Sequence, residues 1–326
     1  MKIEMVGLSD VGVARKNNED SFALLHDVKV GLVCDGMGGH NAGAFASRLA
    51  AEMLQSIYRT PDGRMFEELS QDVELTYRRQ VARIVSGLRL ANRQIYNLAT
   101  KNTKLKGMGT TAAVVAFDEY RAILAHVGDS RIYRIRDREL ILLTEDHSWV
   151  NELIQDREIA KEEARFFKNK NVITRALGIA PRLKIDLRIE PVENGDLFIL
   201  CTDGLTNSLN DDLLQAILVN YKNDLKATAV NLIEMANQVD GSDNITVALM
   251  KVNDMGYGGD PSEPIKILLN EENEKISALE NRYLKRKRSP WRSKKNWFQL
   301  IFTNKIIFSI IVILLTVVIY LLIFPK

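Results

Sequence analysis

Cysteine and histidine are scarce in this chain, which holds two cysteines and four histidines among 326 residues. Two cysteines cannot build a disulfide framework, which favours a reducing compartment. No cysteine or histidine spacing typical of a zinc site occurs, so any metal ion is expected to have oxygen ligands. The first ten residues contain no apolar run of signal-peptide length, and secretion is therefore not expected.

Acidic residues are missing from residues 282–305, which contain nine lysines and arginines. Up to residue 281 the balance is reversed, with 34 basic and 42 acidic residues. An acidic body argues against nucleic acid as the main partner. The basic stretch is expected to contact anionic lipid head groups, with a nucleic-acid patch as the alternative.

Charge is absent from residues 306–324, IIFSIIVILLTVVIYLLIF. This length is close to the roughly 20 residues that cross a bilayer. Trp297 and Phe298 precede it, where interfacial aromatics are favoured, and the basic flank is expected to stay on the cytoplasmic side. We expect a single C-terminal anchor in the cell membrane with the body of the chain in the cytoplasm; a buried core helix is the alternative.

Apolar runs of strand length and segments with helical spacing come in clusters before residue 253, which predicts a mixed α+β fold with antiparallel sheets. Residues 253–305 begin with a Gly-, Asp- and Pro-rich stretch and are expected to be a linker with a basic juxtamembrane segment. The expected strands are 21–26, 29–34, 111–117, 121–127, 130–135, 183–190, 197–202 and 245–252, and the expected helices are 42–58, 77–100, 211–221 and 225–238.

Carboxylates stand at the ends of several expected strands. A single Asp-Gly after a strand is usually a turn, so only the whole set indicates a function. Clustered carboxylates resist ionisation unless cations are present, and their oxygens suit Mg²⁺ or Mn²⁺. Two such cations could activate a water molecule and hold a phosphoryl group. The residues are Glu19, Asp20, Asp35, Asp129, Asp203 and Asp243.

Eight short motifs occur in order between about residues 3 and 252, and together they are highly specific. They are RKNNED at 15–20, DGMGGH at 35–40, GTT at 109–111, GDSR at 128–131, TEDHS at 144–148, NVITRALG at 171–178, TDGL at 202–205 and SDNIT at 242–246. The sequence resembles the metal-dependent protein phosphatases of the protein phosphatase 2C type (PPM), in their bacterial form.

The resemblance implies a four-layer α-β-β-α sandwich of two antiparallel sheets flanked by helix pairs, in a domain spanning residues 1–252. It also implies roles for individual residues. Asp35 would bridge two metals; the Gly36 carbonyl, Glu19 and Asp20 would bind one metal, Asp203 and Asp243 the other, Asp129 with Asp203 a third, and Arg15 would bind phosphate.

The implied activity is hydrolysis of phosphoserine and phosphothreonine in proteins, by in-line attack of a metal-bridging hydroxide. The implied cofactors are two or three Mn²⁺ or Mg²⁺ ions. We expect a monomeric catalytic domain that opposes a membrane serine/threonine kinase. Met37 replaces the histidine of animal members that is thought to protonate the leaving group. The general acid stays open, with His40 or a metal-bound water as candidates.

A pseudophosphatase adaptor is disfavoured because the expected ligands are all present, and a phosphatase for small metabolites stays open. No nucleotide-binding kinase motif occurs. Residues 149–170 would include a flap that influences substrate choice, or else a solvated surface helix. Cys34 and Cys201 are expected to be core thiols, and Thr110 and Thr111 to fix a strand end.

Overall fold

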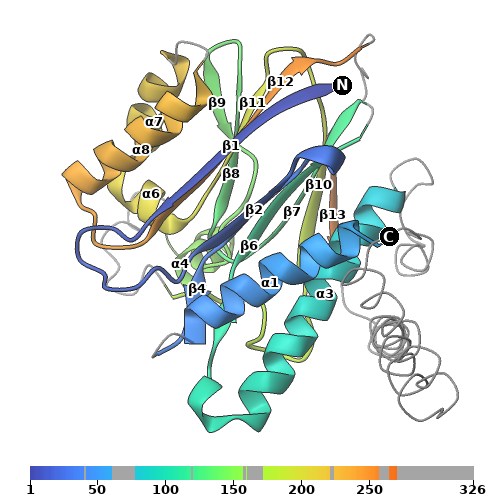
Figure 1. The fold of residues 1–326 in the computed structure, drawn as a ribbon, viewed down its shortest axis with the longest axis vertical. Helices are drawn as coiled ribbons and strands as arrows, with labels where there is room; N and C mark the ends of the chain where they lie inside the picture. The colour runs from blue at the N-terminus through green and yellow to red at the C-terminus, as the bar shows by residue number, and fades with distance from the viewer. Residues whose placement is uncertain are drawn as a thin grey trace, which may run out of the picture. The chain divides into compact units, whose positions relative to one another are not determined.

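The computed structural model describes residues 1–39, 42–60, 78–118, 120–156, 159, 172–220, 224–256 and 264–269. Two large antiparallel sheets dominate this part of the chain (Figure 1). The first has the order β1 (Lys2–Asp10), β12 (Ile245–Asp254), β11 (Leu197–Cys201), β8 (Arg131–Arg136) and β9 (Glu139–Leu142). The second has the order β13 (Ile265–Leu269), β10 (Ile185–Pro191), β7 (Arg121–Val127), β6 (Ala112–Phe117), β3 (Val30–Cys34) and β2 (Ser21–Leu25).

Helices cover the outer face of each sheet (Figure 1). The second sheet is covered by α1 (Ala42–Tyr58) and α3 (Arg78–Lys101), and the first by α6 (Asp203–Ser208), α7 (Asp211–Val219) and α8 (Leu225–Val239). A short helix, α4 (Trp149–Gln155), follows β9. Two 3₁₀ turns lie at His26–Val28 and Thr103–Leu105, and a small ribbon pairs β4 (Gly36–Met37) with β5 (Gly109–Thr110).

Two apolar cores hold these layers together. One lies between the sheets and includes Phe117, Phe198 and Met250, with Phe117 and Phe198 in an edge-to-face contact. The other lies between the first sheet and α6 to α8 and includes Tyr133 and Leu232. Because apolar layers cover both faces, β7 and β11 are buried along their whole length, which explains their nearly continuous apolar sequence.

Side-chain caps define where several helices begin. The Oγ of Ser148 accepts the amide of Asn151 at the start of α4. Asn210 and Asp224 cap α7 and α8 in the same manner. Such caps satisfy amide groups that have no partner within the helix.

The expected α+β fold with antiparallel sheets and flanking helices is confirmed, and each expected strand and helix has a counterpart within a few residues. Among the described elements, β1, β4, β5, β9 and α6 were not expected, and α4 lies in the stretch where a flap or a surface helix was expected. Another unexpected strand, β13, comes from residues 253–305, where we expected a linker, and pairs with β10 at the edge of the second sheet. Its sequence, IKILL, is a short apolar run between polar and Gly-rich neighbours.

Within the described ranges, no helix has the length and apolar character that would let it span a bilayer. The expected anchor at 306–324, the basic stretch at 282–305 and most of the expected flap lie outside those ranges. His40, the candidate general acid, also lies outside them.

Candidate metal centre

The strand ends bring the expected carboxylates together. Asp35 follows β3, Asp203 follows β11 at the start of α6, and Asp20 precedes β2. Burial raises the pKa of Asp35 well above its usual range, and the charges of Asp20, Asp203 and Asp129 raise it further. Like charges have this effect only at short range. Four of the six carboxylates expected from sequence therefore share one site between the two sheets.

Asp20 is joined to two neighbouring strands of the first sheet, at Thr246 in β12 and at Thr202 directly after β11. Its Oδ2 accepts hydrogen bonds from the hydroxyls of Thr202, at 2.8 Å, and Thr246, at 2.7 Å. Burial raises the pKa of Asp20 to about 7, although these two hydrogen bonds favour the charged form. The carboxylate is therefore fixed in place while its negative charge stays poorly compensated.

Gly36 and Glu19 form the opposite wall, beside the first turn of α1. A Cβ on Gly43 would lie 2.6 Å from the Gly36 carbonyl oxygen and 2.7 Å from Oε2 of Glu19, so both oxygens face the same point. A Cβ on Gly36 would lie 2.5 Å from the Glu19 carbonyl oxygen, so that position excludes a side chain. These glycines bring a backbone carbonyl beside a carboxylate, as the expected ligand set requires.

Asp129 and Asp203 supply buried oxygen atoms without partners. Within the described part of the chain, Oδ1 of each carboxylate is buried and accepts no hydrogen bond. Burial raises the pKa of Asp129 to about 7 and raises that of Asp203. The charges of Asp203 and Asp146 add to the first shift and that of Asp243 to the second, whereas a hydrogen bond with Asp35 lowers the pKa of Asp203. Unpaired buried carboxylate oxygens are costly unless a cation compensates them. The residues present therefore fit hard divalent cations such as Mn²⁺ or Mg²⁺.

Arg15 and Asp243 lie at the exposed side of this site. Nη2 of Arg15 donates to Oδ2 of Asp243 at 2.7 Å, and its Nε donates to the carbonyl of Ser242 at 3.3 Å. Oδ1 of Asp243 accepts the amide of Asn244 at 2.8 Å. The structure therefore pairs the expected phosphate-binding arginine with an expected metal ligand, a contact that the sequence did not indicate.

Threonines fix the strand end that carries Asp35, as expected. The Asp35 amide donates to Oγ1 of Thr111, and the Asp35 carbonyl accepts from Oγ1 of Thr110, both at 2.8 Å. Oγ1 of Thr111 also lies 2.7 Å from the hydroxyl of Ser130, beside Asp129. The two threonines therefore connect two carboxylate-bearing turns and perform no evident chemistry.

The two cysteines are buried and free, as expected for core thiols. Burial raises the pKa of both, which makes their thiolate forms scarce. Met37, in β4, offers no exchangeable proton.

Sequence reasoning did not assign roles to three groups that hold the site together. Asn244 ties the loop before β2 by donating to the carbonyls of Val11 and Asn17 and accepting the amide of Glu19. Arg131 and Asp146 form a bidentate ion pair, with Nη2 to Oδ2 at 2.6 Å. His147 is the third. All lie in motifs quoted above, but their partners are distant in sequence.

This fold and this site define a class of proteins: layered α+β enzymes that bind divalent cations with carboxylates at the ends of two antiparallel sheets. A family model described as Protein phosphatase 2C matches residues 13–241. The chain belongs to the protein phosphatase 2C family. The expected enzyme class, a protein-serine/threonine phosphatase, is confirmed by this membership, as is the expected Mn²⁺ or Mg²⁺ cofactor.

Named relatives agree with this membership. The chain is 35% identical to the serine/threonine phosphatase stp of Listeria welshimeri over 257 residues, which cover 78% of this chain and 98% of that protein. It is 36% identical to protein phosphatase PhpP of Streptococcus pneumoniae over 256 residues, which cover 77% of this chain and 98% of the relative.

Solved structures show the same architecture. The Mycobacterium tuberculosis serine/threonine phosphatase PstP/Ppp matches with a TM-score of 0.68 and 31% identity, over 78% of this chain and 100% of that chain. The catalytic domain of PstP in complex with two manganese ions matches with a TM-score of 0.64 and 32% identity, over 77% of this chain and 99% of that one.

Proposed function

We propose that this protein hydrolyses phosphoserine and phosphothreonine in proteins at the cytoplasmic face of a membrane, where it opposes a serine/threonine kinase. The observation that carries the catalytic part is the convergence of Asp20, Asp35, Asp129 and Asp203, whose pKa values are raised by burial and by the charges of neighbouring aspartates. When bound there, two or three divalent cations would supply a water of lowered pKa and neutralise charge on the phosphoryl group.

The chain's own residues hold and orient the reacting groups. Asp35 and Asp203 present oxygens from two different strand ends, and Asp20 is locked by two threonine hydroxyls. Arg15, with its side chain about half exposed, would bind the substrate phosphate. Its described contacts use Nε and Nη2, so we place the phosphate at Nη1.

Phosphate release from a phosphothreonine peptide tests the catalytic part. The full-length chain in detergent, with Mn²⁺, should release phosphate, and excess chelator should stop the reaction. Asp35→Asn and Asp203→Asn should each lose about 100-fold or more, because each removes a ligand charge from the centre. Asp212→Asn, at an exposed site in α7, is the matched control and should retain activity.

Three results would refute the assignment. Inactivity of the wild-type chain with every divalent metal would favour the adaptor interpretation. Full activity of Asp203→Asn would show that the carboxylate cluster is not the catalytic centre. Turnover of a small phosphate ester with an equal or higher kcat/KM than the peptide would favour a metabolite phosphatase.

The membrane part of the proposal depends on sequence. Residues 306–324 carry no charge and follow the basic stretch 282–305, a pattern typical of a single anchor with a cytoplasmic flank. Deletion of residues 300–326 should move the protein from the membrane fraction to the soluble fraction while phosphate release from a soluble peptide continues. An unchanged distribution would refute the anchor without affecting the catalytic assignment.

The kinase partner follows from the proposed location. An enzyme held at the membrane meets membrane-held substrates at a raised effective concentration. Deletion of the anchor should therefore slow dephosphorylation of a membrane-embedded kinase substrate more than that of a soluble peptide. Equal rates for the two substrates in both forms would argue against this part of the proposal.

A further inference from the structure

His147 and Gly128, the residue that precedes Asp129, are joined by two hydrogen bonds. The amide of Gly128 donates to Nδ1 of His147 at 3.0 Å, and the amide of His147 donates to the carbonyl of Gly128 at 2.9 Å. The carbonyl of His147 accepts the amide of Thr174 at 2.8 Å. His147 is 4% exposed, so these bonds are shielded from water. The imidazole therefore accepts a backbone hydrogen bond from the turn that leads to Asp129.

The Gly128 amide fixes the tautomer of His147. A backbone N–H always donates, so Nδ1 must accept, and the proton of the neutral ring stays on Nε2. Nε2 lies 3.4 Å from Oδ1 of Asp186, which also accepts from Nη1 of Arg175 at 2.9 Å. Asp186 thus holds the ring from the side opposite Gly128, in the orientation that keeps Nδ1 toward the turn.

A metal ion does not suit this group, although the donor atoms of His126, His147 and Asp186 lie within 4.8 Å of one another. A metal on Nε2 of His147 would need the lone pair that carries the proton in this tautomer. Nη1 of Arg175 also lies 3.2 Å from Nε2 and places a positive charge there. The contacts instead match a histidine that is oriented by a carboxylate.

The turn that His147 holds has little freedom of its own. Gly128 has φ of +106°, and a Cβ there would lie 2.6 Å from Cγ2 of Thr111. Asp129 follows directly, with its buried Oδ1 free of hydrogen bonds within the described residues. Because Asp129 is the next residue, a rotation of the Gly128 peptide would change the direction in which this carboxylate points. The position of Asp129 therefore depends on what bonds the Gly128 amide.

We propose that His147 is a positioning residue for Asp129: its Nδ1 accepts the Gly128 amide and thereby sets the carboxylate in the metal centre. Asp186 completes the arrangement because its Oδ1 faces the N–H at Nε2. The inference rests on the proposed function, because it assigns Asp129 to a cation. Outer partners of this kind typically change metal affinity by 10–100-fold when they are removed.

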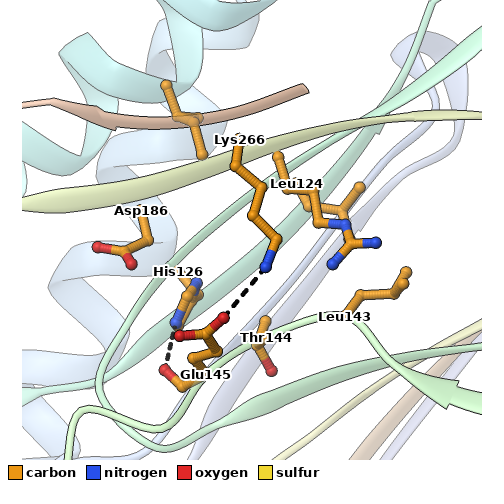
Figure 2. A pocket seen from close by; sticks show the side chains of 9 residues that line it. Leu124, His126, Leu143, Thr144, Glu145, Asp186 and Lys266 are labelled. Carbon is orange, nitrogen blue, oxygen red and sulfur yellow. Dashed lines mark hydrogen bonds and ion pairs between the residues drawn. The ribbon is translucent and has the colours of Figure 1, made fainter. Parts of the chain in front are cut away.

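The surroundings let Asp186 be changed with little risk to the fold. A pocket of about 280 Å³ opens beside it, lined in part by His126, Glu145 and Lys266 (Figure 2). In this pocket Lys266 pairs with Oε1 of Glu145 at 3.1 Å, and Nε2 of His126 lies 2.8 Å from the Glu145 carbonyl. The Asp186 side chain is 34% exposed, against 4% for His147. Asp186→Asn is therefore the milder perturbation.

Mn²⁺ titration by calorimetry tests the proposal on the full-length chain in detergent. The amide oxygen of His147→Asn falls near the place of Nδ1, whereas the amide of His147→Gln falls near that of Nε2. His147→Asn should keep every Mn²⁺ affinity within about 3-fold, while His147→Gln and His147→Ala should weaken one site by about 10-fold or more. Asp129→Asn should lose that same site.

Three outcomes of this titration would overturn the proposal. One is wild-type Mn²⁺ binding by His147→Gln, and another is equal weakening in the Asn and Gln variants. The third is unchanged Mn²⁺ binding by Asp129→Asn. This titration measures Mn²⁺ binding, whereas the catalytic assignment is tested by phosphate release from Asp35→Asn and Asp203→Asn. The role of His147 can therefore be refuted while the catalytic assignment stands.

The ring nitrogens of His147 provide a second measurement that works even if its variants do not fold. The chain has four histidines, so a nitrogen-15 histidine spectrum is simple to assign. The wild type should show Nδ1 unprotonated and Nε2 protonated. Asp186→Asn should reduce the fraction of this tautomer and weaken the same Mn²⁺ site. A proton on Nδ1 in the wild type would overturn the proposal.

Discussion

Arg15 and Asp243 form an ion pair of 2.7 Å that joins the loop before β2 to the start of β12. Each of the two side chains was expected to serve a different ligand, the arginine a phosphate and the aspartate a metal. Their contact places the expected phosphate-binding cation on one carboxylate oxygen of the expected metal ligand. The pair is partly exposed, so its own contribution to stability is expected to be small.

Arg15→Ala should therefore change two quantities in opposite directions. KM for a phosphothreonine peptide should rise by about 10-fold or more, because charged hydrogen bonds to the phosphate are lost. Mn²⁺ should bind slightly more tightly, because Oδ2 of Asp243 loses a competing cation. Steady-state kinetics and calorimetry measure the two effects, with Arg15→Lys as the control that keeps the charge. An unchanged KM would contradict the phosphate-binding role.

Asp35→Asn should separate the stability of the metal-free protein from that of the loaded one. In excess chelator its Tm should equal or exceed that of the wild type, because the substitution removes one of several mutually repelling carboxylates. Addition of Mn²⁺ should raise the Tm of the wild type clearly and that of the variant little. Thermal unfolding with and without Mn²⁺ measures this. An equal Mn²⁺ response in both proteins would contradict the proposed role of Asp35.

Mn²⁺ affinity should rise with pH through about 7. Asp20 and Asp129 have pKa values raised to about 7, mainly by burial, so at neutral pH the folded protein still holds protons on them. Cations bind the charged form and must expel these protons. Calorimetry in buffers of different ionisation enthalpy should therefore show proton release near pH 7 and none near pH 9. Affinity independent of pH between 6 and 8 would contradict the assignment of these ligands.

Asp20 and Asp129 should also make the free energy of unfolding depend on pH when chelator is present. Because their folded pKa values exceed the unfolded value of 3.8, the folded state binds more protons, so this contribution favours folding as pH falls from about 8 toward 5. Asp129→Asn should remove the part of this pH-dependent stabilisation that Asp129 contributes. Chemical unfolding across this pH range provides the measurement.

His126 should act on stability in the opposite direction. Burial, and then the charge of His147, lowers its pKa from 6.5 to about 4, while Asp186 and Asp146 oppose the shift. The unfolded state therefore binds the proton first, and stability should fall as pH drops from about 6.5 to 4, by at most about 3 kcal/mol. The difference in unfolding free energy between wild type and His126→Gln isolates this contribution. A difference that does not depend on pH would show that His126 titrates normally.

The local spacing of apolar residues was enough to predict most strands and helices. Sheets that are covered on both faces require apolar strands such as β7, and such runs are visible in the sequence. This spacing did not reveal β1, whose sequence KIEMVGLSD is interrupted by Gly7. A Cβ at that glycine would lie 2.5 Å from the ring of Phe22, so the packing of β2 requires the interruption. The strand is held by β12, from the other end of the domain, and no local signal reports that pairing.

The candidate site was predictable in its ligand types but not in its supporting contacts. Acids at strand ends, read together with the family resemblance, placed Asp35 and Asp203 in one cluster. The ion pair of Arg15 with Asp243 and the bond from Gly128 to His147 join segments that are far apart in sequence. Which of many polar residues meet is decided by the register of two sheets, and sequence spacing does not determine that register.

The location of bound manganese tests the central claim most directly. Crystals of the full-length protein grown with Mn²⁺ and measured at the manganese absorption edge should show at least two anomalous peaks. We predict that they lie within ligand distance, about 2.0–2.5 Å, of the carboxylates of Asp35 and Asp203. Peaks that avoid both aspartates, or that occur only beside His126 and Asp186, would contradict the account.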